Sequence, residues 1–119
     1  MLQQNMGELE VIQVEAQLAD ALGKFHREQQ GHAPESVEAR LLSDMAVIRS
    51  TGAFTSTENT LCATDEGRKL VQSARREQRA LTRREAEARV AKVLSRPVLR
   101  SYYDLDVRLG EQVEVYILG

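Results

Sequence analysis

The sequence has little of what builds cross-linked, metal-bound or membrane-spanning proteins. Cys62 is its only cysteine, which excludes a disulfide within the chain and a metal site built from several cysteines. Tryptophan is absent, and with three tyrosines and two phenylalanines the core must consist mainly of Val, Leu, Ile and Ala. No apolar run approaches the roughly 20 residues that cross a bilayer, and the first ten residues lack the basic and apolar segments of a secretory signal. We therefore expect a cytoplasmic protein that is not inserted in a membrane.

Charged side chains are abundant, but they are unevenly distributed along the chain. The 119 residues suffice for one compact core, so we expect residues 1–119 to form a single domain. Residues 66–92 contain nine basic and four acidic side chains, whereas the remainder contains seven basic and fourteen acidic ones. The two net charges, +5 and −7, add up to the total of −2. Such an arrangement favours a definite orientation toward a charged partner, but it does not identify the partner.

The first 30 residues read as a long helix with two apolar stripes. One stripe recurs at three- and four-residue steps and consists of Val11, Val14, Leu18, Leu22 and Phe25. The other lies about 140° around the helix and consists of Leu9, Ile12, Ala16 and Ala19. A helix on a sheet needs one stripe, so the second indicates contact with another helix of the chain or with the same helix of a second subunit. We predict a homodimer in which the second stripe is the dimer face.

Two pairs of short alternating segments predict two β-hairpins. Segments 36–42 and 45–51 flank a tight turn at Ser43-Asp44, and Gly110 supplies the positive φ of a turn in the last segment. One face of the strand before that last turn carries Tyr103, Leu105 and Val107. The same alternation recurs after the turn at Val113, Val115 and Ile117.

Three helix-start signals lie between the hairpins. Thr55-x-x-Glu58 has the spacing of a capping box, and Thr64 precedes two acidic residues that suit a helix N-terminus. The third signal, Thr82-x-x-Glu85, coincides with a change in the direction of the apolar side chains. One set, which shares a direction, consists of Leu70, Ala74, Leu81 and Ala88. The other, which points more than 120° away, consists of Ala86, Val90, Val93 and Leu94. We therefore predict two helices, about 65–81 and 83–95, or one helix kinked near Thr82.

The predicted order of elements is α-β-β-α-α-β-β. This order indicates an α+β fold in which the two hairpins form one four-stranded antiparallel sheet. The helices are expected to pack on one face of that sheet.

Several short motifs, taken in this order, resemble those of the small bacterial MpsC-like family. They are Gly31-x-x-Pro34, Asp44-Met45, Phe54-Thr55, Thr64 to Arg68, and Gly110 to Val115. The resemblance runs from about residue 7 to 118 and departs from the family at Ser43, where Gly is usual, and at Cys62-Ala63, where Ala-Lys is commoner. It implies a small cytoplasmic accessory protein of a membrane system that generates a potential and transports ions or bicarbonate. No active site carries over from the family.

Signals for an enzyme or a metal site are weak. His26 and His32 are separated by a helix-ending glycine, so we interpret His26 as a last-turn cation of the helix and His32 as a loop residue. Asp104 and Asp106 share a strand face that Glu114 could join, either as a Mg²⁺ or Ca²⁺ site or as an ordinary exposed charged face. No glycine-rich phosphate loop or nucleophile elbow is present. We predict no enzymatic activity, no cofactor and no metal.

The arginine-rich stretch 73–90 is the candidate binding surface. Arg75, Arg79 and Arg83 are spaced at i, i+4 and i+8 and line one face of a straight helix, flanked by Arg76 and Arg84. Such a face suits an acidic protein, phosphates or anionic headgroups, although the interleaved glutamates are also typical of a solvated helix face. The pI near 5.7 and the lack of an aromatic platform on this helix argue against nucleic acid.

Two functions follow from these features. The first, implied by the resemblance, is a non-enzymatic accessory protein that interacts with a membrane transport protein. The alternative is a soluble regulator that binds nucleic acid or a small anion through the arginine-rich helix face.

Overall fold

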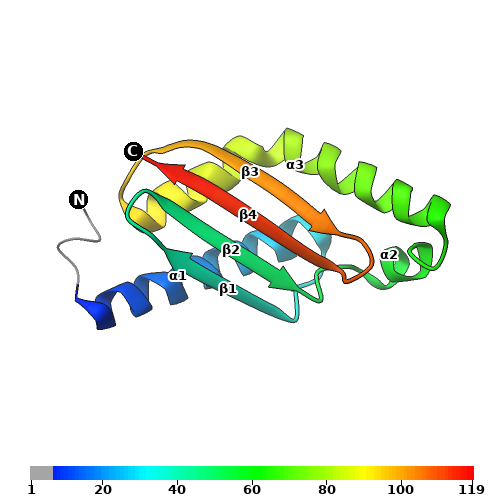
Figure 1. Ribbon diagram of the computed structural model, residues 1–119, viewed down its shortest axis with the longest axis horizontal. Helices are drawn as coiled ribbons and strands as arrows, with labels where there is room; N and C mark the ends of the chain where they lie inside the picture. Colours follow the sequence, from blue (N-terminus) through cyan, green and yellow to red (C-terminus); the bar gives the residue numbers. More distant parts are fainter. Residues whose placement is uncertain (1–6) are drawn as a thin grey trace.

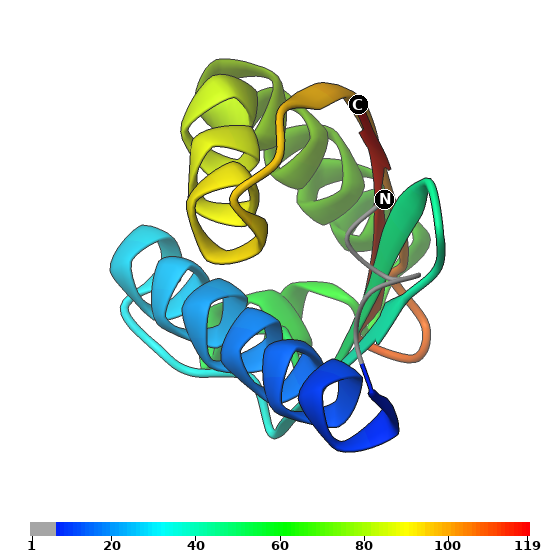
Figure 2. The ribbon, with the colours of Figure 1, turned by 90° about the vertical axis from the view of Figure 1, so that its left-hand side faces the viewer.

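Two long helices lie against one face of a four-stranded antiparallel sheet, and no other described element covers the opposite face (Figure 1 and Figure 2). The structure is a computed structural model that describes residues 7–119. Its elements are α1 (Glu8–Gln30), β1 (Ser36–Leu41), β2 (Met45–Thr51), α2 (Ser56–Leu61), α3 (Asp65–Leu94), β3 (Val98–Asp106) and β4 (Glu111–Leu118). The predicted α+β fold and its element order are confirmed.

The sheet has the strand order β1-β2-β4-β3, so each hairpin contributes one central and one edge strand. Alternation places β2 and β4 side chains on the helix side and on the open side in turn. The open side of these two strands carries Met45, Val47, Val113, Val115 and Ile117, all only partly buried, together with the polar residues Arg49, Thr51 and Glu111. The helix side carries Ala46, Ile48, Ser50, Gln112, Glu114, Tyr116 and Leu118, all buried.

Helix α1 packs through the first of its two predicted stripes. Leu18, Leu22 and Phe25 are buried in the main core, where Ile48, Tyr116, Val90 and Leu94 also lie. The helix ends at Gly31, whose φ of 75° favours glycine. In the second stripe, Leu9 and Ile12 are 76% and 58% exposed, Ala16 is exposed, and Ala19 packs against the core. The stripe is therefore largely accessible, and its role as a dimer face stays a prediction.

The predicted start of helix α2 is confirmed. Glu58 N–H donates to Thr55 Oγ1 at 3.2 Å, and Thr55 N–H donates to the Glu58 carboxylate at 2.9 Å. These two bonds are the reciprocal pair of a capping box. Helix α3 begins in a similar way, because Thr64 Oγ1 accepts a hydrogen bond from Gly67 N–H at 3.0 Å.

The predicted break of the third helix at Thr82 is wrong. Helix α3 is continuous over 30 residues, and Thr82 Oγ1 donates to the Gln78 carbonyl at 3.0 Å instead of starting a new helix. The outward set of the predicted apolar residues includes Leu70 and Leu81, which are 61% and 79% exposed. A single inward stripe runs the whole length of the helix. Its middle section is polar, so a search for apolar residues alone does not detect it in the sequence.

Candidate functional site

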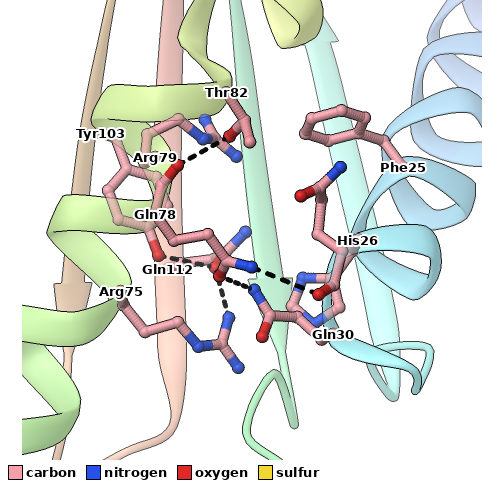
Figure 3. Close-up of a pocket in the computed structure, with 10 residues that line it drawn as sticks. Phe25, His26, Gln30, Arg75, Gln78, Arg79, Thr82, Tyr103 and Gln112 are labelled. Carbon is pink, nitrogen blue, oxygen red and sulfur yellow. Dashed lines mark hydrogen bonds between the residues drawn. The ribbon is translucent and has the colours of Figure 1, made fainter.

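The inward stripe of α3 turns from apolar to polar where the helix passes over the centre of the sheet. The sequence of inward residues is Gly67, Val71, Arg75, Gln78, Arg79, Thr82, Ala86, Val90 and Leu94. The polar members face His26 and Gln30 of α1 and Tyr103 and Gln112 of the sheet, around a small cavity (Figure 3). The arginine-rich stretch therefore contributes to the interior of the protein.

Arg75 is 3% exposed and holds three parts of the chain together. Its Nε and Nη2 donate to the two carboxylate oxygens of Glu58, each at 2.6 Å, in a bidentate pair. Nη2 also donates to the Ala53 carbonyl at 2.6 Å, and the guanidinium carbon lies 5.2 Å from the centre of the Phe54 ring. These contacts join α3 to α2 and to the loop between β2 and α2.

Glu58 serves both the capping box and the ion pair. Burial alone raises the pKa of its carboxyl, but the hydrogen bonds and the charge of Arg75 and the backbone hydrogen bond of Thr55 outweigh burial. The pKa of Glu58 consequently lies below its ordinary value, and the carboxylate is ionised at neutral pH. One side chain thus fixes the start of α2 and the position of α3.

A second buried ion pair connects α3 to the central strand β4. Arg79 Nη1 donates to Glu114 Oε1 at 2.7 Å, and Glu114 is 2% exposed. Tyr116 Oη donates to the same oxygen at 2.5 Å, and the Arg79 guanidinium stacks over Tyr103 at 4.5 Å from the ring centre. Burial, followed by the negative charge of Glu114, raises the pKa of Tyr116 well above its ordinary value, so its hydroxyl remains a donor.

Gln112 links the two ion pairs. Its Oε1 accepts from Arg75 Nη1 at 3.5 Å and from Tyr103 Oη at 3.0 Å, while its Nε2 donates to Glu114 at 3.4 Å. The arginine and glutamate charges of the network cancel. The adjoining cavity has a volume of about 20 Å³, enough for about one water molecule. We interpret the network as the polar centre of the core, which fixes how α1, α3 and the sheet meet.

His26 belongs to this interior and is not the last-turn cation that we expected. It is 5% exposed, and its Nε2 lies 3.0 Å from the Ala53 carbonyl that Arg75 also contacts. Burial and then the positive charge of Arg75 lower its pKa to about 4. The ring is therefore neutral at neutral pH, and Nε2–H donates to a carbonyl that can only accept.

Acidification is expected to destabilise the protein through His26. Because the pKa is about 4 in the fold and about 6.5 in the unfolded chain, the unfolded chain binds the proton first, and stability falls as the pH drops from about 6.5 toward 4. Between about pH 7 and pH 5 the loss should be about 2 kcal/mol. Urea unfolding at both pH values measures it, and in His26→Gln, which retains an amide donor, most of the difference should disappear. An equal loss in both proteins would contradict this assignment.

The structure divides the five candidate arginines into two groups. The prediction that Arg75 and Arg79 share an exposed face with Arg83 is wrong, since their side chains are 3% and 13% exposed and paired with glutamates. Arg76 is 54% exposed and pairs with Asp104 at 3.0 Å, and Arg83 and Arg84 are exposed. Arg76, Arg83 and Arg84, which we call the exposed arginines, are the members available to a partner.

The other candidates from the sequence do not assemble. Glu114 pairs in register with Tyr103 and faces the helices, so it does not share a strand face with Asp104 and Asp106. Within residues 7–119 no group of three or more His, Cys, Asp or Glu side chains could hold a metal ion. In the same part of the chain no helix combines the length and apolar character needed to cross a bilayer.

Comparison with known proteins gives one match. Residues 11–119 match the family model described as "Na+-translocating membrane potential-generating system (MpsC)". No curated protein and no solved structure matches the chain.

Proposed function

The chain belongs to the MpsC family, and on that basis we propose that it is a non-enzymatic accessory protein of a membrane system that moves ions or bicarbonate. The observation that supports this proposal is the extent of the family match, which takes in every helix and strand at least in part. The protein acts by binding, since the buried polar side chains are engaged in holding the fold. Its proposed location is the cytoplasm, at the inner side of the membrane component.

The exposed arginines form the proposed docking surface for that component. Arg76 and Arg83 lie on the side of α3 that borders β3, beside a groove of about 190 Å³, and Arg84 is exposed next to Arg83 on the same helix. The groove is lined by Arg76, Arg79, Ala80, Arg83, Ser101, Tyr102 and Tyr103. Guanidinium groups beside tyrosine rings suit carboxylates on a partner protein, because arginine pairs with acids and also stacks on aromatic faces. The proposed partner surface is therefore an acidic cytoplasmic segment of a membrane protein.

The alternative, a regulator that binds nucleic acid or a small anion, draws on the same surface. It has fewer cations than the sequence indicated, because Arg75 and Arg79 are occupied by Glu58 and Glu114. Binding to phosphates would weaken steeply with salt, since each neutralised phosphate releases counterions. The experiment below separates the two functions by what is recovered.

Exchanging Arg83 and Arg84 for glutamate is expected to abolish docking without disturbing the fold. The tagged protein is expressed in its native cells, membranes are solubilised in mild detergent, and captured proteins are identified by mass spectrometry. The wild type should recover a membrane transport protein, and Arg83→Glu/Arg84→Glu should recover at least about tenfold less, because charge reversal at a rim changes attraction to repulsion.

The matched control for this experiment is Arg27→Glu/Arg108→Glu, which makes the same change of charge at exposed positions outside α3. It should recover the transport protein as well as the wild type does. Recovery of soluble proteins or nucleic acid alone would contradict the accessory role. Equal recovery by all three proteins would contradict the docking surface.

A further inference from the structure

The central strands of the sheet are mainly apolar on the face that the helices leave open, where Arg49 and Glu111 are their charged residues. In β4, the buried helix side carries Gln112 and Glu114, whereas Val113, Val115 and Ile117 point to the open side. In a strand with one face exposed to solvent, polar residues normally lie on the exposed face and apolar residues on the buried face. Apolar residues on both faces of neighbouring strands are typical of a sheet that is covered on both faces. The open face, which continues in β2, thus has the composition of an interface.

The strand registers arrange this face in parallel rows that cross the sheet, of which the outermost, with Ser36 beside Thr51 and Asp106 beside Glu111, is polar and the other three carry the apolar side chains. The middle row consists of Arg40, Val47, Val115 and Tyr102. On one side of it lies the row Glu38, Arg49, Val113 and Asp104. On the other side Met45, Ile117 and Arg100 are aligned. In these three rows the two central strands carry apolar side chains apart from Arg49, and the two edge strands carry charged side chains of both signs.

We propose that a second copy of this chain covers the open face, with a two-fold axis along the middle row. A 180° rotation about this axis places the row that contains Val113 in one copy over the row that contains Ile117 in the other. Val115 then lies against Val115 of the partner, and Val113 lies against the partner's Ile117. On β3, Arg100 of each copy lies over Asp104 of the other, which forms two ion pairs across the interface. The result is a pair of stacked sheets with the helices outside, as in aligned sheet packing.

The charges of the open face favour a second copy over a strongly charged partner. Its charged side chains sum to −1, so the face neither repels a second copy strongly nor attracts a strongly acidic or basic surface. They are Glu38, Arg40, Arg49, Arg100, Asp104, Asp106 and Glu111. Arg40 would face Arg40 of the partner, but Glu38 lies 3.7 Å from it within the same chain and offsets that repulsion. The opposite signs at Arg100 and Asp104 make the face complementary to itself.

The test measures molar mass by light scattering and sedimentation over a range of concentrations. The wild type should be a dimer, and Val115→Arg should be a monomer with an unchanged melting temperature when measured at a concentration where both are monomeric, because this side chain lies outside the core. Arg100→Asp should weaken the dimer by roughly a hundredfold, because it opposes two carboxylates. Arg100→Asp/Asp104→Arg should restore it, since the two signs are only exchanged.

The matched control is Ile12→Glu on the exposed stripe of α1, which should remain a dimer. A monomeric wild type at about 100 µM, where a typical specific dimer of about micromolar Kd or tighter would be formed, would overturn the proposal. A dimer that survives Val115→Arg but dissociates in Ile12→Glu would overturn it in favour of the α1 stripe. A double exchange that fails to restore what Arg100→Asp removes would overturn the proposed axis. None of these outcomes depends on the function proposed above.

Discussion

Replacing Arg75 with methionine is expected to lower the free energy of unfolding by about 3–5 kcal/mol. Methionine retains most of the apolar stem but removes the guanidinium, which leaves the Glu58 carboxylate without its bidentate partner. The Ala53 carbonyl and Gln112 lose a donor at the same time. Glu58 is partly buried, and a carboxylate that loses its counter-charge in such a setting, together with a buried carbonyl and amide that lose a donor, is among the few defects that destabilise a protein this strongly.

The control for this prediction is Arg83→Met, which makes the same chemical change on the exposed side of α3. Its free energy of unfolding should stay within about 0.5 kcal/mol of the wild type, because exposed positions without buried partners tolerate substitution. Urea unfolding, followed by circular dichroism, measures both proteins. Equal losses would show that Arg75 acts as a surface residue.

A double substitution separates the ion pair from the packing around it. Arg75→Met/Glu58→Met removes both charges, and it should recover part of the stability that Arg75→Met loses, since replacing a whole buried pair with apolar side chains is often tolerated. The recovery is expected to be incomplete, because Glu58 also caps α2. A double variant less stable than the sum of the two single losses would contradict this account of the pair.

Gly67→Ala is expected to destabilise the protein by about 3 kcal/mol or more, although alanine is the better helix former. The first turn of α3 packs directly against the end of α2 at this position. A Cβ on Gly67 would lie 1.6 Å from the Leu61 carbonyl oxygen and 2.5 Å from its carbon. Because these are backbone atoms, α2 must move away, and the Thr64 cap and the Glu58 pair move with it.

Gly23→Ala in α1 provides the matched control for Gly67→Ala. Gly23 is also inside a helix, but the nearest atom to its added Cβ is Val37 Cγ2 at an ordinary 3.5 Å. This variant should gain about 0.5–1 kcal/mol, as alanine normally does in a helix. Thermal unfolding of the two variants compares them directly. A stabilised Gly67→Ala would contradict the close contact between α2 and α3.

Most of the fold could be predicted from local signals. The hairpin turns, the Thr55 capping box, the Thr64 cap and the end of α1 at Gly31 each depend on a few neighbouring residues. Each of these signals depends on residues that are only a few positions apart, so the contacts that they make in the structure can be predicted directly from the sequence. Together with period-two alternation they determined the order of the elements and the antiparallel sheet.

The site could not be predicted, because its partners are distant in the sequence. Arg75 is buried with a carboxylate 17 residues before it, and Arg79 with one 35 residues after it. Arginine is normally exposed, so a prediction based on apolar residues assigns Arg75 and Arg79 to the surface. It also gives a helix break near Thr82, where the inward stripe continues but consists of polar residues. The signal that could have found the stripe is its spacing, which continues from Val71 to Ala86 without a change of direction.

His26 was misplaced for a related reason. A basic residue near the end of a helix is usually a cation that interacts with the helix dipole. Here the same position faces the interior, because it follows Phe25 on the inward side of α1 and meets the Ala53 carbonyl of a loop 27 residues away. Only the tertiary contact distinguishes a neutral buried histidine from an exposed charged one.

The division of the arginines into a buried pair and an exposed group is the central claim, and exchange of their Nε–H protons with water tests it most directly. In ¹⁵N-resolved NMR spectra near neutral pH, the Nε–H of Arg75, which donates to Glu58 at 2.6 Å, should exchange roughly a hundredfold more slowly than those of Arg83 and Arg84. Uniformly fast exchange at all of these arginines would contradict the claim and return Arg75 to the surface of the helix.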